Sequence, residues 1–229
     1  MVFNLSSKRA EGRTAVDSPV KALRIGAIAL IALAVTLLAG RYSASVASVN
    51  DGAMAMTQGM VQRSLQILRN TNAPVTQRRR DLRAVLEGHF DFAEMARFAL
   101  GSHWRTLTPE QREDFTNLFK AFIEDAYLSK IQDYQGQDVQ FIRERQLGGG
   151  YVEIDSKIVQ GGKSPISVNY LLEQKDGGWM IYDVTVDAIS IIANYRNQFN
   201  RVINDQGYPK LVSDLRAKQQ QLASLLGGL

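Results

Sequence analysis

A small set of polar residues has the types and spacing that catalysis would need. His103 follows Ser102, and His89 lies two residues before Asp91, so the components of a Ser-His-Asp hydrolase are present. The sequence contains no Gly-x-Ser-x-Gly motif, which places the nucleophile of many such hydrolases between a strand and a helix. We therefore expect both histidines to form hydrogen bonds at turns or helix ends.

Asp183 and Asp187 alternate with apolar residues near the end of a predicted strand. A carboxylate inside an apolar cavity has a raised pKa and can act as a general base. The alternation places both side chains opposite the apolar side of the strand, which favours an exposed or hydrogen-bonded structural role. An enzyme that uses Asp183 for isomerase or hydratase chemistry is the alternative.

Metal and cofactor sites lack their usual sequence patterns. The chain has no cysteine, which excludes disulfides, thiolate zinc sites and thiol catalysis. No pair of histidines or carboxylates recurs with ligand spacing. Gly148-Gly149-Gly150 lacks the lysine and the following helix of a phosphate loop and predicts a turn. We expect no catalytic residue, no metal and no cofactor.

Arg78, Arg79, Arg80 and Arg83 form the one concentrated basic patch of the sequence. These side chains could meet anionic lipid headgroups or an acidic partner protein. A helix spreads three consecutive side chains over most of its circumference, so a solvated helix face is the favoured interpretation.

The formal net charge of +4 comes from the front of the chain. Residues 1–47 contain six basic and two acidic side chains, whereas residues 48–229 contain equal numbers of both. Proteins that bind nucleic acids present a basic face to the phosphates. We therefore expect residues 48–229 to bind no nucleic acid.

Residues 1–47 have the order of an export signal. The charge-free segment 25–40 follows Lys21 and Arg24, and Ser45-Val46-Ala47 offers the small residues that signal peptidase accepts. The segment is shorter than the roughly 20 residues of a comfortable membrane span. We predict a signal peptide cleaved after Ala47, with retention as an N-terminal membrane anchor as the alternative. In both cases residues 48–229 cross to the periplasm.

The first half of residues 48–229 has apolar residues at three- and four-residue spacing, which is typical of helices. The clearest helix start is Thr108-Pro109 with Gln111, which matches a capping box. The spacing predicts helices over about 51–70, 75–87 and 90–100, from 109 onward, from about 190, and after Gly207.

After Gly136 the apolar period changes to two, which indicates strands. Predicted strands cover 138–146, 151–160 and 165–174, and a fourth follows Asp176-Gly177-Gly178, with Met180, Tyr182, Val184 and Val186 on one side. The sequence therefore predicts one α+β domain over residues 48–229, in which helices pack on a curved four-stranded antiparallel sheet. Such a sheet can enclose an apolar pocket.

Many aromatic and aliphatic residues would serve equally well in a dry core or around an apolar ligand, and periodicity does not separate these uses. The candidate ligand-binding residues are those on the inward sides of the predicted elements: Phe92, Met95, Leu100, Trp104, Phe119, Phe122, Tyr127, Val152, Ile154, Val168, Tyr170, Tyr182, Val184 and Val186.

Several short segments, spread over about Met54 to Leu222, match one family pattern. They are Phe90-Asp91-Phe92, Ala99-Leu100-Gly101, Trp104-Arg105, Leu107-Thr108-Pro109-Glu110-Gln111, Val168-Asn169-Tyr170, Gly178-Trp179-Met180-Ile181-Tyr182-Asp183-Val184 and Asn194-Tyr195-Arg196-Asn197-Gln198-Phe199. Together they resemble the MlaC or toluene-tolerance family of exported phospholipid carriers. One departure is Asp187-Ala188, which stands where family members usually carry Glu-Gly.

The resemblance implies a cone-like fold similar to the nuclear-transport-factor group, with an apolar pocket for lipid tails. It implies a periplasmic shuttle that carries phospholipid between an outer-membrane lipoprotein complex and an inner-membrane ATP-driven complex. A branch of the family is associated with hopanoid lipids, so a hopanoid is the alternative ligand. A membrane-anchored scaffold with a filled core is the remaining alternative.

Overall fold

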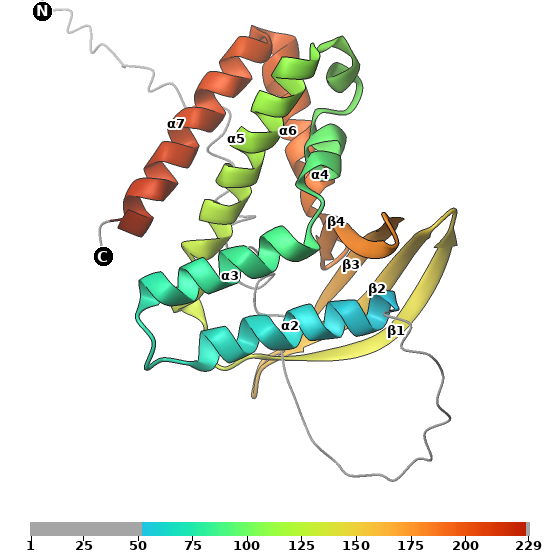
Figure 1. Cartoon of the computed structure of the whole chain (residues 1–229), viewed down its shortest axis with the longest axis vertical. Helices are drawn as coiled ribbons and strands as arrows, with labels where there is room; N and C mark the ends of the chain where they lie inside the picture. The colour runs from blue at the N-terminus through green and yellow to red at the C-terminus, as the bar shows by residue number, and fades with distance from the viewer. Residues whose placement is uncertain (1–51, 228–229) are drawn as a thin grey trace, which may run out of the picture.

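The computed structural model describes residues 52–227 (Figure 1). The predicted signal peptide or anchor, residues 1–47, lies outside the described residues. No helix between residues 52 and 227 combines the length and the apolar composition needed to cross a membrane. The helices and strands follow in the order α2 (Ala53–Arg69), α3 (Val75–His89), α4 (Phe92–Leu100), α5 (Pro109–Leu128), β1 (Asp138–Gly148), β2 (Tyr151–Val159), β3 (Ile166–Lys175), β4 (Gly178–Val186), β5 (Ile189–Ser190), α6 (Ile191–Gln206) and α7 (Tyr208–Gly227).

The sheet is an antiparallel meander in the order β1-β2-β3-β4-β5. This arrangement confirms the predicted α+β class and the curved antiparallel sheet, but the sheet has five strands and not four. The fifth strand, β5, consists of Ile189 and Ser190 and pairs with the end of β4. Two residues are too few to show a period, so this strand could not be predicted from the apolar pattern.

The helices form two groups around the sheet. α2 runs alongside the curved sheet and packs on β1 and β2, and α3 lies between α2 and a bundle of α4, α5, α6 and α7 (Figure 1). Each group has its own apolar core. The sheet core joins α2 and α3 to the inner side of the sheet, and the bundle core joins α4 to α7. Phe90 and Ile191 pack against both cores and mark the place where the two meet.

A β-bulge changes the side-chain alternation of β4. Leu171 pairs with Asp183 and Leu172 pairs with Ile181, so Tyr182 is the extra residue. Ile181, Val184 and Val186 are therefore the buried apolar residues of this strand, whereas Met180, which was predicted on the same side, is only partly buried. The prediction that Tyr182 shares a side with Val184 was wrong, because a bulge shifts the period within the strand. Tyr182 is half-buried and packs against the rings of Tyr151 and Phe98.

The two histidines form the hydrogen bonds that were expected of them. His89 Nδ1 lies 2.7 Å from the carbonyl oxygen of Val85, at the end of α3. His103 Nε2 lies 2.8 Å from Asn200 Oδ1, which connects the short helix after α4 to α6. Neither ring is hydrogen-bonded to a serine hydroxyl or a carboxylate among the described residues.

Candidate functional site

An apolar cavity of about 70 Å³ lies where the sheet core and the bundle core meet. Its walls come from α2, α3, α4, α5, α6, β3, β4 and the connection from α3 to α4. The lining residues are Met60, Val61, Ser64, Leu86, Phe90, Phe92, Met95, Ile123, Tyr127, Tyr170, Asp183, Val184, Ile191 and Ile192. A cavity at this junction follows from the architecture, because two separately packed cores leave space between their facing surfaces.

The chemistry of the cavity wall is that of an apolar ligand site. Ser64 and Asp183 are the lining residues with a polar group close to the backbone, and the two tyrosines add a hydroxyl at the end of a ring. Ser64 Oγ donates to the carbonyl oxygen of Met60 at 3.1 Å, so its hydroxyl is already satisfied within α2. Such a wall suits hydrocarbon, which needs no specific hydrogen bond from the protein.

Asp183 has a structural role in this wall. Its carboxylate accepts hydrogen bonds from the backbone N–H of Val184 at 2.7 Å and of Ile192 at 3.1 Å, and from the hydroxyl of Ser190. Burial raises the pKa of Asp183, and the hydrogen bonds oppose that rise. The hydroxyl of Ser190 in turn accepts from the N–H of Ala193 at 2.8 Å and caps α6. Asp183 thus fixes the start of α6 against β4, in agreement with the hydrogen-bonded role that its position predicted.

The connection from α3 to α4 is anchored on the sheet. The backbone N–H of Asp91 donates to the carbonyl oxygen of Ile181 in β4 at 2.9 Å. The Asp91 side chain accepts from the N–H of Glu94 at 2.9 Å and caps α4. Lys175 pairs with the second carboxylate oxygen of Asp91. Because Asp91 is held at three points, the rings of Phe90 and Phe92 on either side of it are held in the cavity wall.

Five of the fourteen candidate ligand-binding residues line the cavity. They come from four separate elements and approach one another only in the folded chain: Phe92, Met95, Tyr127, Tyr170 and Val184.

The other nine candidates lie elsewhere in the fold. Leu100, Phe119 and Phe122 are buried in the bundle core, and Val152, Ile154, Val168 and Val186 are buried in the sheet core. Trp104 is half-buried beneath the guanidinium of Arg112, 5.7 Å from the ring centroid, and Tyr182 lies at the bulge. A role of these nine residues in ligand binding stays a prediction, and this cavity does not bring them together.

Nine residues that line the cavity were not among the predicted ligand-binding residues. They are Met60, Val61, Ser64, Leu86, Phe90, Ile123, Asp183, Ile191 and Ile192. Met60 and Ile123 lie within helices that the apolar spacing predicted, over 51–70 and from 109 onward, but this spacing does not show which residue of a helix borders a cavity. Phe90 and Ile191 lie at the ends of elements, where no periodic pattern exists to assign them.

The favoured interpretation of the basic patch as a solvated helix face was wrong for Arg79, whereas the side chain of Arg83 is 43% exposed and also forms an ion pair. Arg79 is 7% exposed, and its Nη1 donates to the carbonyl oxygen of Leu226 at 2.9 Å. Arg83 Nη2 lies 2.6 Å from Asp125 Oδ1. Both guanidinium groups bind other parts of the protein, because α3 is placed between the sheet and the bundle.

Comparisons with known proteins agree with this architecture. A family model described as MlaC protein matches residues 58–217. The intermembrane phospholipid transport system binding protein MlaC of Haemophilus influenzae is 30% identical over 129 residues, which cover 55% of this chain and 58% of that protein. The toluene tolerance protein ttg2D of Pseudomonas putida is 26% identical over 103 residues, which cover 45% of this chain and 48% of that protein. The matched region thus spans about half the length of these curated relatives.

A solved structure has the same fold. It is the phospholipid-binding protein from Ralstonia solanacearum in complex with a phospholipid, with a TM-score of 0.67 and 24% sequence identity. The match covers 75% of this chain and 98% of that chain.

Proposed function

Because the chain belongs to the MlaC family, we propose that it is an exported protein that binds phospholipid and carries it between the membranes of a bacterial envelope. The observation that carries this proposal is the apolar cavity between the sheet core and the bundle core. The names of the relatives point to the same ligand class. In this proposal the partners are an inner-membrane ATP-driven complex and an outer-membrane lipoprotein complex.

A lipid carrier must supply an apolar environment, because exposing a lipid chain to water costs free energy. A chain of about 15 methylenes, at roughly 0.8 kcal/mol each, costs on the order of 12 kcal/mol to expose to water. A carrier must replace nearly all of that apolar environment with its own side chains. The lining supplies methionine, leucine, isoleucine, valine and phenylalanine, and leaves the headgroup to be solvated at the surface.

Binding requires the cavity walls to move apart. An engineered apolar cavity of about 150 Å³ holds one benzene molecule. The cavity measures about 70 Å³, which is too small for a lipid chain. The two cores that border it are packed separately, so they can separate without disrupting the interior of either one.

A cavity-filling variant tests the proposal. Delipidated protein mixed with labelled phospholipid should take up about one lipid per chain, and Met60→Trp should reduce this uptake at least tenfold because the indole occupies the cavity. Val212→Trp is the matched control, since Val212 lies in a surface groove of α7 away from the cavity. No uptake by folded wild-type protein, or full uptake by folded Met60→Trp, would refute the proposal.

The cargo itself can be identified by native mass spectrometry of the exported protein. A phospholipid mass bound to the chain supports the proposal as stated. A bound hopanoid mass would instead indicate a carrier of the hopanoid-associated branch of the family. The bare chain mass after gentle extraction would instead support a scaffold with no ligand.

A further inference from the structure

The α3–α5 seam is the part of the cavity wall formed by Leu86 of α3 and Ile123 of α5. Charged residues of the same two helices lie next to this apolar pair in the sequence. Arg83 is one turn before Leu86, and Glu124 follows Ile123 directly. The ion pairs between the two helices therefore cross the seam beside the cavity.

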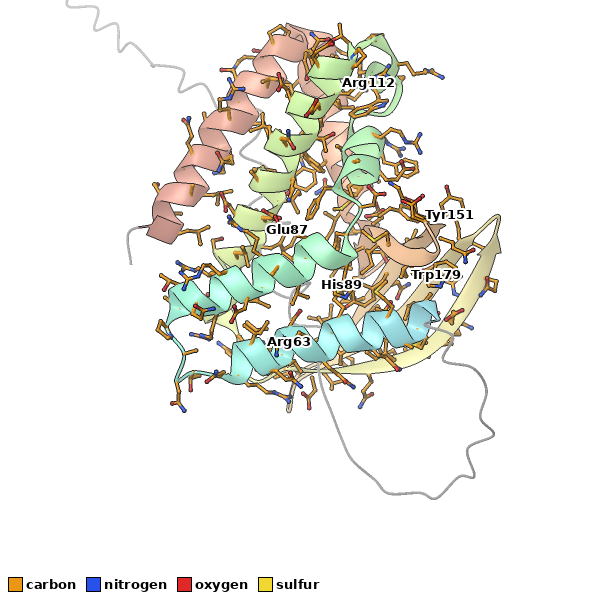
Figure 2. All side chains as sticks on the ribbon, in the orientation of Figure 1. Arg63, Glu87, His89, Arg112, Tyr151 and Trp179 are labelled. Carbon is orange, nitrogen blue, oxygen red and sulfur yellow. The ribbon has the colours of Figure 1, made fainter. Side chains whose placement is uncertain are left out.

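Three ion pairs connect the helices across the seam. Arg83 Nη2 lies 2.6 Å from Asp125 Oδ1, and Arg83 Nε lies 3.6 Å from Glu124 Oε2. On the other side of Leu86, Glu87 Oε1 accepts from Lys120 Nζ at 2.7 Å. Figure 2 shows Glu87 on the part of α3 near α5. The seam thus combines the apolar residues Leu86 and Ile123 with ion pairs from the residues before and after Leu86.

α3 is the helix of this wall with the fewest buried apolar residues. Its buried residues are Arg79, Leu82 and Val85, whereas α5 buries eight residues along its length. Moving α3 away from α5 therefore exposes little apolar surface to water. The C-terminal end of α3 is tied to β4 through the hydrogen bond from Asp91 to Ile181, which gives the helix a fixed end about which to turn.

The seam also contains a buried carboxylate that opposes closure. Glu124 is 3% exposed, and its Oε1 has no hydrogen-bond partner among the described residues. Three carboxylates, Glu87, Glu124 and Asp125, face two cations, Arg83 and Lys120. One negative charge is in excess, and it is placed where water does not reach it.

We propose that lipid enters and leaves through the α3–α5 seam, which Arg83 holds closed and the buried carboxylate of Glu124 drives toward opening. The inference rests on the proposed lipid-binding function and assigns Arg83 and Glu124 as positioning residues for lipid exchange. Neither residue lines the cavity. Their effect is therefore on the rate of exchange and not on the contacts with bound lipid.

This arrangement makes exchange depend on pH. Burial raises the pKa of Glu124 from 4.5 to about 7, with Arg83 and Lys120 lowering it and Glu87 and Asp125 raising it further. When the seam opens, water reaches the carboxylate and its pKa returns toward 4.5. A raised pKa in the closed form means that protonation stabilises closure, so opening becomes easier as the pH rises from about 4.5 to about 7.

Exchange rates of variants test the proposal. The measurement is transfer of a fluorescent phospholipid from purified protein to phosphatidylethanolamine and phosphatidylglycerol vesicles, between pH 5 and pH 8. Arg83→Ala should transfer about tenfold faster, because two buried carboxylates lose their cation. Glu124→Gln should transfer several-fold more slowly at pH 8 and lose the rise with pH, because an amide has no charge to hydrate. Arg97→Ala, which removes an arginine paired with Glu94 on α4, should match wild type.

Opposite effects of the two variants separate positioning from simple loss of stability. A destabilised fold would speed transfer in both Arg83→Ala and Glu124→Gln. Transfer by Glu124→Gln that is as fast as wild type at pH 8, with the same pH dependence, would overturn the role of Glu124. Arg83→Lys should transfer lipid more slowly than Arg83→Ala, because lysine keeps the positive charge.

A cross-link across the seam tests the route directly. The chain has no cysteine, so Glu87→Cys with Lys120→Cys provides the only reactive pair for a cleavable thiol cross-linker. Cross-linked protein loaded with lipid should transfer it at least tenfold more slowly and recover when the linker is cleaved. Gln111→Cys with Ser213→Cys, which links α5 to α7 across a surface groove, is the matched control and should not slow transfer.

The results of these experiments distinguish a failure of the proposed lipid-binding function from a failure of the proposed route. Wild-type protein that takes up no lipid refutes the proposed function. Protein that takes up lipid, but transfers it equally fast with and without the cross-link, refutes the α3–α5 seam as the route and leaves the lipid-binding function standing.

Discussion

The bundle core and the cavity wall are built from different kinds of residue. In the bundle core the rings of Phe115, Phe119, Tyr195 and Phe199 interlock, with Phe119 at 5.8 to 5.9 Å from each of the other three. The contacts with Tyr195 and Phe199 are edge-to-face, which is a favourable geometry for aromatic pairs. The cavity wall combines mostly aliphatic and methionine side chains from eight parts of the chain.

This difference shows how the fold separates stability from ligand binding. Rings on regular helices meet at fixed spacing and can fill the space between α5 and α6 completely. At the junction of the two cores, residues at the ends of helices, such as Phe90 after α3 and Ile191 at the start of α6, approach from irregular directions and leave space. Methionine and aliphatic side chains adjust to a flexible ligand more readily than interlocked rings do.

The largest predicted effect contrasts one residue from each region. Phe119→Ala should lower the free energy of unfolding by about 3–5 kcal/mol, because it leaves a hole among fixed rings. Met60→Ala should cost about 2 kcal/mol, since Met60 already borders unfilled space. Urea unfolding followed by circular dichroism measures both values. Lipid uptake per folded chain should change for Met60→Ala and stay constant for Phe119→Ala.

The reverse order of stability loss would contradict the comparison. It would mean that the cavity wall, and not the aromatic cluster, holds the bundle and the sheet together. A loss of lipid uptake in folded Phe119→Ala would show that the bundle core also contributes to the binding site, as the sequence predicted for Phe119.

A smaller effect is expected where the cavity wall is fixed by hydrogen bonds. Asp183→Asn keeps one acceptor oxygen but replaces the other with a donor, so it should lower the free energy of unfolding by about 1–3 kcal/mol. Asp187→Asn is the matched control, because Asp187 accepts one hydrogen bond at an exposed turn and should change stability by less than about 0.5 kcal/mol.

Lipid loading of Asp183→Asn separates the carrier from the enzyme alternative. A carrier in which Asp183 only fixes the start of α6 should retain about one lipid per folded chain. Chemical turnover of the lipid by wild type, abolished in Asp183→Asn with the lipid load intact, would support an enzyme that uses this carboxylate.

The regular elements were predictable because each carries a local signal. The capping box of Thr108 and Gln111 is present at the start of α5, with hydrogen bonds in both directions. Glycine turns separate the strands of the meander, and the helix spacing placed α2 and α3 to within a few residues. The resemblance to the MlaC family extended over most of the described chain and indicated the fold and the ligand class.

The cavity itself was not predictable residue by residue. Phe119 and Phe92 have the same side chain and both lie on apolar helix faces, but only Phe92 borders the cavity. The distinction depends on where two cores meet, which is a property of the tertiary structure. The side of Tyr182 was predicted wrongly for a related reason. The extra residue in β4 breaks the alternation, so Ile181, and not Met180 or Tyr182, is buried together with Val184 and Val186.

The smallest predicted effect concerns the turn between β4 and β5, just beyond the cavity wall. Asp187 and Ala188 both have positive φ, at 47° and 65°, which is the left-handed region that favours glycine. The side chain of Ala188 cannot form a hydrogen bond that would offset this backbone strain. Asp187 can, because its Oδ1 accepts from the backbone N–H of Ser167 at 3.1 Å. Ala188→Gly should therefore raise the free energy of unfolding by about 0.5–1 kcal/mol, because it removes the steric cost of Cβ.

Asp187→Gly is the comparison that isolates the cause, since it relieves the same backbone strain but removes the hydrogen bond to Ser167. It should gain less stability than Ala188→Gly, or lose some, in urea unfolding of the two variants side by side. Lipid uptake should be unchanged in both, because neither residue lines the cavity. Equal gains would show that the backbone alone sets the cost of this turn. A loss in Ala188→Gly would mean that the alanine stabilises the turn through the unfolded chain, where glycine has more conformational freedom to lose.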